Sequence, residues 1–257
     1  MKTEPSGTQL TTQGKWLRFA LVGLPVGLAL LGAASFWIYF EKKEREEKRT
    51  YRHALALRRD ISAEEIGRYQ GIIGDAAKLS ADERRQTLAS FVESTLGAEN
   101  MGYDLKKDVQ TDRGVERLSF RVSLDGMRRP SDVVLVVAGY GDAKSADDSA
   151  LAVLFSIAHA MTGMPRIKTV QFGVLDASVG TMQPAFDRLE YDMRKRGDRI
   201  VHLVALGASA RSIADEWSRK PGAGLVTANP VIPKNADELK SEAEALQMVI
   251  TTAADRL

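Results

Sequence analysis

The residues of this chain that could do chemistry follow two apolar runs of the kind that form buried strands. They are acidic, polar or turn-forming, namely Gly139, Tyr140, Asp142, Asp147, Asp148, Asp176 and Ser178. Carboxylates that lie together can bind a metal ion or transfer protons, and a serine can act as a nucleophile. Because open α/β sheets bind ligands beyond the carboxyl ends of their strands, we expect these residues to form one rim.

Most of these residues also have a simpler explanation. Asp147 and Asp148 are suited to cap a helix that begins near Ser149, because carboxylates stabilise the positive end of a helix. The glycines of "GYGD" are suited to a turn, and this turn lacks the lysine of a phosphate-binding loop. Ser178 stands in "DASVG", which lacks the G-x-S-x-G elbow of many serine hydrolases.

A metal site is the alternative use of the acidic residues. Asp142, Asp148 and Asp176 all follow strands, but this set contains no imidazole or thiolate donor. His159 lies about three helical turns from Asp148, which is too far for both to bind one metal ion. We expect His159 to be a half-buried packing residue, and we expect structural roles for the other two histidines, His53 and His202.

The elements that must position this rim follow from the hydrophobic pattern. Continuous apolar runs predict buried strands, and the amphipathic segments between them predict helices. The strands are 133–138, 170–175 and 200–206, with a short fourth strand at 225–227, and the helices are 149–162 and 183–196. Such an alternation indicates a three-layer α/β/α sandwich with a mixed, mostly parallel sheet that is covered on both faces.

Further elements precede and follow this core. Two capping boxes, Ser62 with Glu65 and Ser80 with Glu83, predict helix starts, and the alternating "RLSFRVSL" at 117–124 predicts a half-exposed strand. Asn235 is expected to cap a last helix, 236–257, whose apolar stripe docks on the core or on a partner. The stripe comprises Leu239, Ala243, Leu246, Ile250, Ala253 and Leu257.

The N-terminal part of the chain carries a long apolar run. Residues 19–40, "FALVGLPVGLALLGAASFWIYF", contain no charge, and a helix of that length covers the roughly 30 Å hydrocarbon core of a bilayer. A cleaved signal peptide is the alternative, but this run is long for one and "FWIYFEKKE" is a poor cleavage site. We expect a disordered tail at 1–15, a transmembrane helix at 16–40, a charged helical stalk at 41–60 and an α/β domain at 61–257.

Charge and composition exclude some classes of function. Lysines and arginines are more frequent after the apolar run than before it, which favours a cytoplasmic domain, but long domains cross membranes largely regardless of charge. Both orientations therefore stay open. The net charge of +2 gives no reason to expect a nucleic-acid partner, and the absence of cysteine excludes disulfides and thiolate metal sites.

Residues 61–210 resemble the dinuclear zinc exopeptidase family, which includes bacterial leucyl aminopeptidases, glutamate carboxypeptidase and the non-catalytic transferrin receptor. The resemblance rests on the order of "ISAEEIGRYQGIIG", "GAENMGYDLKKD", "VVLVVAGYGD", "ADDSALAVLFSIAHAM" and "RIKTVQFGVLDASVG". It implies two zinc ions held by histidines and carboxylates, with a glutamate acting as base on the metal-bound water.

Most of the family's site residues are replaced at the matching positions. The resemblance places the family's first histidine at Gly139, its bridging aspartate at Asp148, its glutamate pair at Ser178 and Val179, and its later aspartate at Val204 or Ala205. Only Asp148 keeps the ligand. No histidine follows His202 to close the site.

We therefore expect a membrane-anchored, catalytically inactive zinc-peptidase-like domain that acts in protein binding or assembly, with an unknown protein partner and no cofactor. One alternative is an active metal-dependent aminopeptidase or related hydrolase with displaced ligands, which would bind zinc. Another is an oligomeric membrane scaffold that associates through the stalk or the 236–257 helix. If the habit of the family holds, the chain is a single-pass protein of the bacterial inner membrane with its domain outside the cytoplasm.

Overall fold

The computed structural model describes residues 36–37, 39, 41–42, 53–112, 115–141, 145–177, 181–229 and 235–256. The chain divides into two compact units, Met1–Thr50 and Tyr51–Leu257, which are treated separately. The few described residues of the first unit are helical and exposed. The predicted tail, most of the predicted transmembrane helix, and residues 43–52 of the predicted stalk lie outside the described residues. Among the residues that are described, no helix is both long enough and apolar enough to cross a bilayer.

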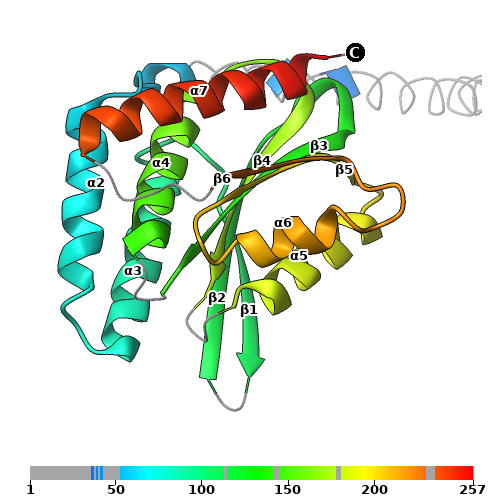
Figure 1. The fold of residues 1–257 in the computed structure, drawn as a ribbon. Coiled ribbons are helices and arrows are strands. Elements are labelled where there is room, and N and C mark those ends of the chain that lie inside the picture. Colours follow the sequence, from blue (N-terminus) through cyan, green and yellow to red (C-terminus); the bar gives the residue numbers. More distant parts are fainter. Residues whose placement is uncertain are drawn as a thin grey trace, which may run out of the picture. The chain divides into compact units, whose positions relative to one another are not determined.

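A six-stranded sheet forms the centre of the second unit, in the order β1-β2-β4-β3-β5-β6 over the described residues (Figure 1). The strands are β1 (Lys106–Asp112), β2 (Val115–Leu124), β3 (Gly126–Tyr140), β4 (Arg166–Asp176), β5 (Arg199–Leu206) and β6 (Leu225–Asn229). The pairs β4/β3, β3/β5 and β5/β6 are parallel, whereas β1 and β2 extend the sheet in antiparallel pairing.

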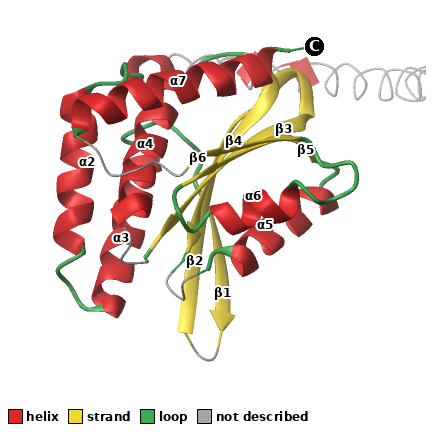
Figure 2. Ribbon diagram, viewed as in Figure 1, coloured by secondary structure: helices red, strands yellow, loops and turns green. Residues whose placement is uncertain are grey.

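Helices cover both faces of this sheet (Figure 2). One face carries α2 (Ala63–Ala76), α3 (Ala81–Leu96), α4 (Ser145–Met161) and α7 (Ala236–Asp255), and the other carries α5 (Gln183–Lys195) and α6 (Arg211–Trp217). Two apolar cores result because successive residues of a strand point to opposite faces. In β3, Val134 and Val136 belong to the core beneath α4, whereas Val133 and Leu135 belong to the core beneath α5.

This arrangement confirms a mixed α/β fold with a mostly parallel sheet. The strands expected from apolar runs are present but longer. β3 begins at Gly126 and becomes buried only from Val133, whereas β4 begins at Arg166 and is at least partly buried throughout. Two elements were not expected. The sequence of β1, "KKDVQTD", is polar because β1 is an edge strand, and α6 is too short to show a helical period.

The last helix docks on the chain's own core. As expected, the Asn235 side chain caps α7 by accepting a hydrogen bond from the backbone N–H of Glu238 at 2.9 Å. The buried positions of α7 are Leu239, Ala243, Leu246, Ile250 and Ala254. They pack in the core that α2 and α4 share, so most of the predicted stripe is covered within the chain. Ala254 rather than Ala253 completes this face, and Leu257 lies outside the described residues.

The two predicted capping boxes have different outcomes. At α3, the Glu83 carboxylate accepts from the Ser80 backbone N–H at 3.2 Å and from its hydroxyl at 2.7 Å. At α2, the Ser62 hydroxyl accepts from the Glu65 N–H at 3.2 Å, which is half of the box. The Glu65 carboxylate instead contacts Nδ1 of His159 at 3.0 Å. In a buried position, an ionic partner stabilises a carboxylate more than a backbone amide does.

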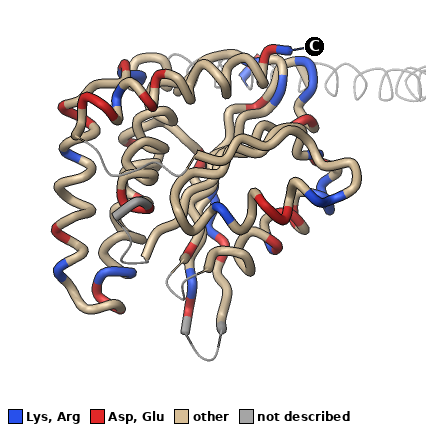
Figure 3. The backbone as a smooth tube through the Cα atoms, viewed as in Figure 1, with Lys and Arg blue, Asp and Glu red and all other residues tan. Residues whose placement is uncertain are grey.

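Acidic and basic residues are interspersed over the helices and strands of this unit (Figure 3). This distribution agrees with the small net charge of +2. Individual acidic and basic side chains can therefore pair with each other, as Arg84 and Asp148 do at the predicted rim.

Candidate functional site

The predicted rim lies where β3, β4 and β5 end and α4 begins. Parallel pairing places Tyr140 beside Asp176 at the carboxyl ends of β3 and β4. The backbone of Ala177 extends this pairing by donating to the Tyr140 carbonyl at 2.9 Å. Two of the seven predicted rim residues, Asp142 and Ser178, lie outside the described residues.

Asp147 fastens α4 to the loop that follows β5. Its buried carboxylate accepts a hydrogen bond from the backbone N–H of Ser209 at 2.9 Å and another from the Ser209 hydroxyl at 2.6 Å. Gly207 permits this approach, because its φ is +89° and an added Cβ would lie 2.5 Å from Oδ1 of Asp147. The helix predicted to start near Ser149 begins four residues earlier, so Asp147 lies inside the first turn of α4 rather than at its cap, and its carboxylate is still near the positive end of the helix.

Asp148, the one position that keeps the family's ligand, is paired with an arginine. Nη2 of Arg84 on α3 lies 2.8 Å from Oδ1 of Asp148, and the Arg84 side chain is only 4% exposed. Asp148 also lies inside the first turn of α4, near the positive end of the helix, rather than at the predicted cap position. The positive charge beside this carboxylate comes from the protein itself.

Gly139 has little space for a larger side chain. A Cβ at this position would lie 3.2 Å from the Cβ of Ala177, 3.4 Å from the Sδ of Met182 and 3.5 Å from the Cβ of Ser209. These neighbours occupy the region that the family's histidine would need. The position that the resemblance assigns to a histidine is therefore closely packed.

Tyr140 and Asp176 are buried at the ends of their strands. The Tyr140 hydroxyl donates to the Leu118 carbonyl at 2.6 Å. Burial, and then the negative charge of Asp176, raise the pKa of the Tyr140 hydroxyl, so this group stays protonated near neutral pH. The Asp176 backbone N–H contacts the Ser119 hydroxyl at 3.4 Å, which connects the rim to β2.

These contacts decide whether zinc fits the rim. A zinc ion in a protein site takes three or four donors, and a pair of ions needs more. Within the described parts of the chain, no three His, Asp or Glu side chains converge closely enough to hold a metal ion. Val204 and Ala205, which match the later aspartate of the family, are buried apolar residues inside β5. The described residues therefore do not fit a dinuclear zinc centre.

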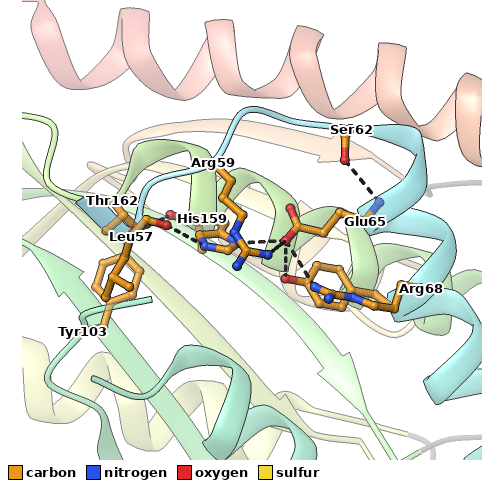
Figure 4. A network of polar contacts seen from close by, with 10 residues as sticks. Leu57, Arg59, Ser62, Glu65, Arg68, Tyr103, His159 and Thr162 are labelled. Carbon is orange, nitrogen blue, oxygen red and sulfur yellow. Dashed lines mark hydrogen bonds and ion pairs between the residues drawn. The ribbon is translucent and has the colours of Figure 1, made fainter. Parts of the chain in front are cut away.

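A second cluster of ionisable residues lies away from the rim, where α2, α4 and the segment 53–60 meet (Figure 4). Nδ1 of His159 lies 3.0 Å from Oε1 of Glu65, and Nε2 of His159 lies 2.9 Å from the Leu57 carbonyl. The Glu65 carboxylate also accepts from the Tyr69 hydroxyl at 3.2 Å. Both ring nitrogens of His159 therefore lie beside oxygen atoms of other residues.

This cluster is structural in its contacts. Burial raises the pKa of Glu65, but the hydrogen bond and charge of His159, with contributions from Tyr69 and Arg59, outweigh burial and lower it. The expected half-buried packing role of His159 was therefore wrong, because the ring is buried and paired. Glu65 and His159 are 94 residues apart in the chain, so no local pattern could have revealed their contact.

An apolar groove of about 530 Å³ runs between α7 and strands β5 and β6. We call it the α7 groove, and its lining includes Lys168, His202, Leu225, Met248, Val249 and Arg256. None of its described lining residues is acidic. Nε2 of His202 contacts the Thr227 hydroxyl at 2.9 Å, whereas its buried Nδ1 has no hydrogen-bond partner among the described residues. Burial, and then the charges of Lys168 and Arg256, lower the pKa of His202.

Comparison with known proteins identifies relatives by fold only. No protein-family model matches the chain, and no curated protein sequence matches it. A putative zinc-dependent exopeptidase from Bacteroides vulgatus is 11% identical, with a TM-score of 0.51 over 78% of this chain and 98% of that protein. LapA from Legionella pneumophila is 10% identical, with a TM-score of 0.50 over 81% of this chain and 77% of LapA.

A glutaminyl cyclase from Fimbriiglobus ruber is also similar, at 13% identity and a TM-score of 0.46 over 57% of this chain. The similarity spans 61% of that enzyme's length. The exopeptidase and LapA support a coarse zinc-peptidase-like fold for this chain. At such low identity they carry no information about activity.

Proposed function

We propose that the α/β domain is a protein-binding module built on a zinc-exopeptidase-like fold, and that it does not hydrolyse peptides. The observation that carries this proposal is the contact between Arg84 and Asp148 at 2.8 Å. The retained carboxylate already has a buried cation beside it, so a metal ion at the same place would meet a like charge.

The chemistry of the rim agrees with this proposal. Peptide hydrolysis by zinc needs an open coordination position and a base for the bound water. The base of the family matches Ser178, whose hydroxyl cannot take a proton from water near neutral pH. The contacts of Asp147 and Asp148 hold α4 against β5 and α3, which makes the rim a structural junction.

The α7 groove supports a binding role. Met248 and Leu225 are largely exposed although both are apolar, and the groove presents Lys168 and Arg256 without an acidic lining residue among those described. Apolar surface beside unopposed positive charge favours a segment of a partner protein that carries apolar side chains and a carboxylate. We propose such a segment as the occupant of the groove.

The absence of hydrolysis is tested by metal content and turnover. The full-length chain, purified without chelator and dialysed against zinc, is expected to contain less than one zinc per chain and to release no product from aminoacyl substrates. An active zinc aminopeptidase carried through the same steps is the positive control. Stoichiometric zinc together with turnover would favour the alternative of an active hydrolase with displaced ligands.

The binding role is tested by crosslinking in cells. A photo-crosslinking residue replaces Met248 in the groove, or Tyr191 on α5, which is a matched control because the two side chains are 66% and 58% exposed. We expect a discrete adduct with another protein from position 248 and none from position 191. The purified partner should then bind a Val249→Glu chain about ten-fold more weakly, since the new carboxylate repels an acidic segment.

Other outcomes of this experiment contradict the proposal. Equal adducts from both positions would show that the groove has no special role. An adduct between two copies of the chain would instead favour the oligomeric scaffold.

We further propose that residues 16–40 anchor the chain in a membrane, with the α/β domain outside the cytoplasm. The support is the charge-free run 19–40, which has the length of a membrane span. The full-length chain should remain in the membrane fraction after alkaline extraction, and a C-terminal phosphatase fusion should be active. Release of the chain by alkaline extraction would contradict the membrane anchor. An inactive fusion would indicate that the α/β domain lies in the cytoplasm.

A further inference from the structure

A polar pocket of about 320 Å³ lies on the α5 face of the sheet, at the end opposite to the rim. We call it the polar pocket, and its lining includes Lys106, Arg121, Asp125, Gln171, Arg196 and Asp198. It also contacts Val133 at the start of the buried part of β3. At about 3.3 Å per residue, it is about 20 Å from Gly139 along that strand.

The alternation of β2 and β4 explains why polar groups lie here. Phe120 and Val122 of β2, and Val170 and Phe172 of β4, point into the core beneath α4. The residues between them therefore point to the opposite face, where α5 covers only part of the sheet. β3 is also irregular next to the pocket, with register shifts on both sides of Arg129, and such bulges often accompany binding sites.

Two hydrogen-bond donors of the pocket lack partners. Nε2 of Gln171 and Nη1 of Arg121 are buried atoms without a hydrogen-bond partner among the described residues. Gln171 is only 2% exposed, so its amide is held inside the protein. Buried donors are normally paired, because an unpaired one loses its interaction with water and gains nothing. Both unpaired groups are N–H donors, so a ligand that pairs with them must offer a hydrogen-bond acceptor.

The charges around the pocket favour an anion as that acceptor. Lys106, Arg121 and Arg196 face Asp125 and Asp198, and Nε of Arg196 is already paired with Asp198 at 3.0 Å. Asp125 is exposed, so it adds little negative charge to the interior. Burial, and then the nearby Arg196, lower the pKa of Arg121, and the carboxylates of Asp192, Asp108 and Asp198 offset this only in part.

We propose that the polar pocket binds the oxyanion group of a small molecule, a phosphoryl or carboxylate group, with Arg121 and Gln171 as donors at its floor. Lys106, which is exposed, closes over the same group from the mouth. Arginine forms two parallel hydrogen bonds to such groups, and the Gln171 amide adds a neutral donor. The volume of the pocket falls within the range of small-molecule sites.

The test is a titration of the full-length chain with inorganic phosphate and, separately, with succinate, at constant ionic strength. Saturable binding is measured by calorimetry and by the increase in Tm. The Gln171→Leu and Arg121→Met chains should each bind about ten-fold more weakly, the loss expected when a hydrogen bond to a charged group is removed. Arg211→Met is the matched control, because it removes an exposed positive charge from α6, outside the pocket lining, and should bind as the wild type does.

The pattern of results identifies the ligand or overturns the proposal. Binding of phosphate alone indicates a phosphoryl ligand, and binding of succinate alone indicates a carboxylate ligand. An equal response to phosphate, succinate and chloride means an adventitious ion only and overturns the site. Equal binding by the wild type and the Gln171→Leu chain also overturns it, and this variant keeps the test valid if Arg121→Met does not fold, since leucine has a similar volume to glutamine.

Discussion

Arg84 is the residue on which the rim most depends. It brings a cation from α3 to the carboxylate of Asp148 on α4, and it is almost completely buried. In a zinc exopeptidase the corresponding carboxylate would face metal ions. Here a side chain of the protein supplies the positive charge and joins two helices.

Replacing Arg84 by methionine should therefore destabilise the domain. Breaking a buried ion pair by removing one partner costs about 3–5 kcal/mol, and the 21% exposure of Asp148 reduces the expected loss to about 2 kcal/mol. Urea unfolding of the Arg84→Met and Asp148→Asn chains, and of the double variant, measures the coupling between the two groups. Glu244→Gln, which breaks an exposed pair with Lys240 on α7, is the control and should change stability by about 0.5 kcal/mol or less. A loss in Arg84→Met as small as that of the control would contradict the assigned role.

Restoring the family's histidine at Gly139 should not restore zinc binding. The imidazole would have to displace Ala177, Met182 and Ser209, so we expect a loss of about 1–3 kcal/mol from overpacking. Unfolding measured with and without zinc checks this. Stabilisation of the Gly139→His chain by zinc, absent in the wild type, would show that the remaining donors are adequate after all.

Among the strands and helices, β5 carries His202 in the lining of the α7 groove, and the protonation of this histidine is linked to folding. The lowered pKa of His202 means that the folded state binds its proton less readily than the unfolded chain, whose ordinary value is 6.5. Its contribution to stability is therefore complete above about pH 6.5 and declines as the pH falls through this value towards the folded-state pKa. Protonation would also add a positive charge to the α7 groove.

The predicted consequence is a change in slope. The free energy of unfolding, measured in urea between neutral and mildly acidic pH, should fall less steeply for His202→Asn than for the wild type. His53→Gln, at an exposed position, should keep the wild-type slope. Identical slopes for all three chains would contradict the assignment to His202.

Some helices and strands could be predicted from the sequence, and others could not. α3, β2 and α7 were predictable because their apolar positions recur with the helical or strand period over many residues. β1 escaped because an edge strand does not need an apolar face. Asp148 could be singled out from its place after a strand, but its partner Arg84 could not, since 64 residues separate them and the contact exists only after α3 packs on α4.

For the molecule as a whole, the segment before α2 belongs to the domain. Leu57 accepts a hydrogen bond from His159, and Gly163, with a φ of +67°, leaves room for the backbone of Leu55, which an added Cβ would approach to 2.9 Å. A fragment that begins at His53 should therefore be more stable than one that begins at Ile61, by about 1–3 kcal/mol, because the shorter one leaves a buried imidazole with one acceptor fewer. Thermal unfolding of the two fragments measures this, and equal Tm values would contradict it.

The α7 groove and the polar pocket share β4, whose neighbouring residues Lys168 and Thr169 line one each, on opposite faces of the sheet. Two occupants of the domain would thus be separated by the thickness of a single backbone. If a bound anion changes the affinity for the partner by some factor, the bound partner must change the affinity for the anion by the same factor, because the two equilibria are thermodynamically linked. A coupling factor of one would mean that the two sites bind independently across β4. Any other value would mean that β4 transmits the effect of each ligand to the other site.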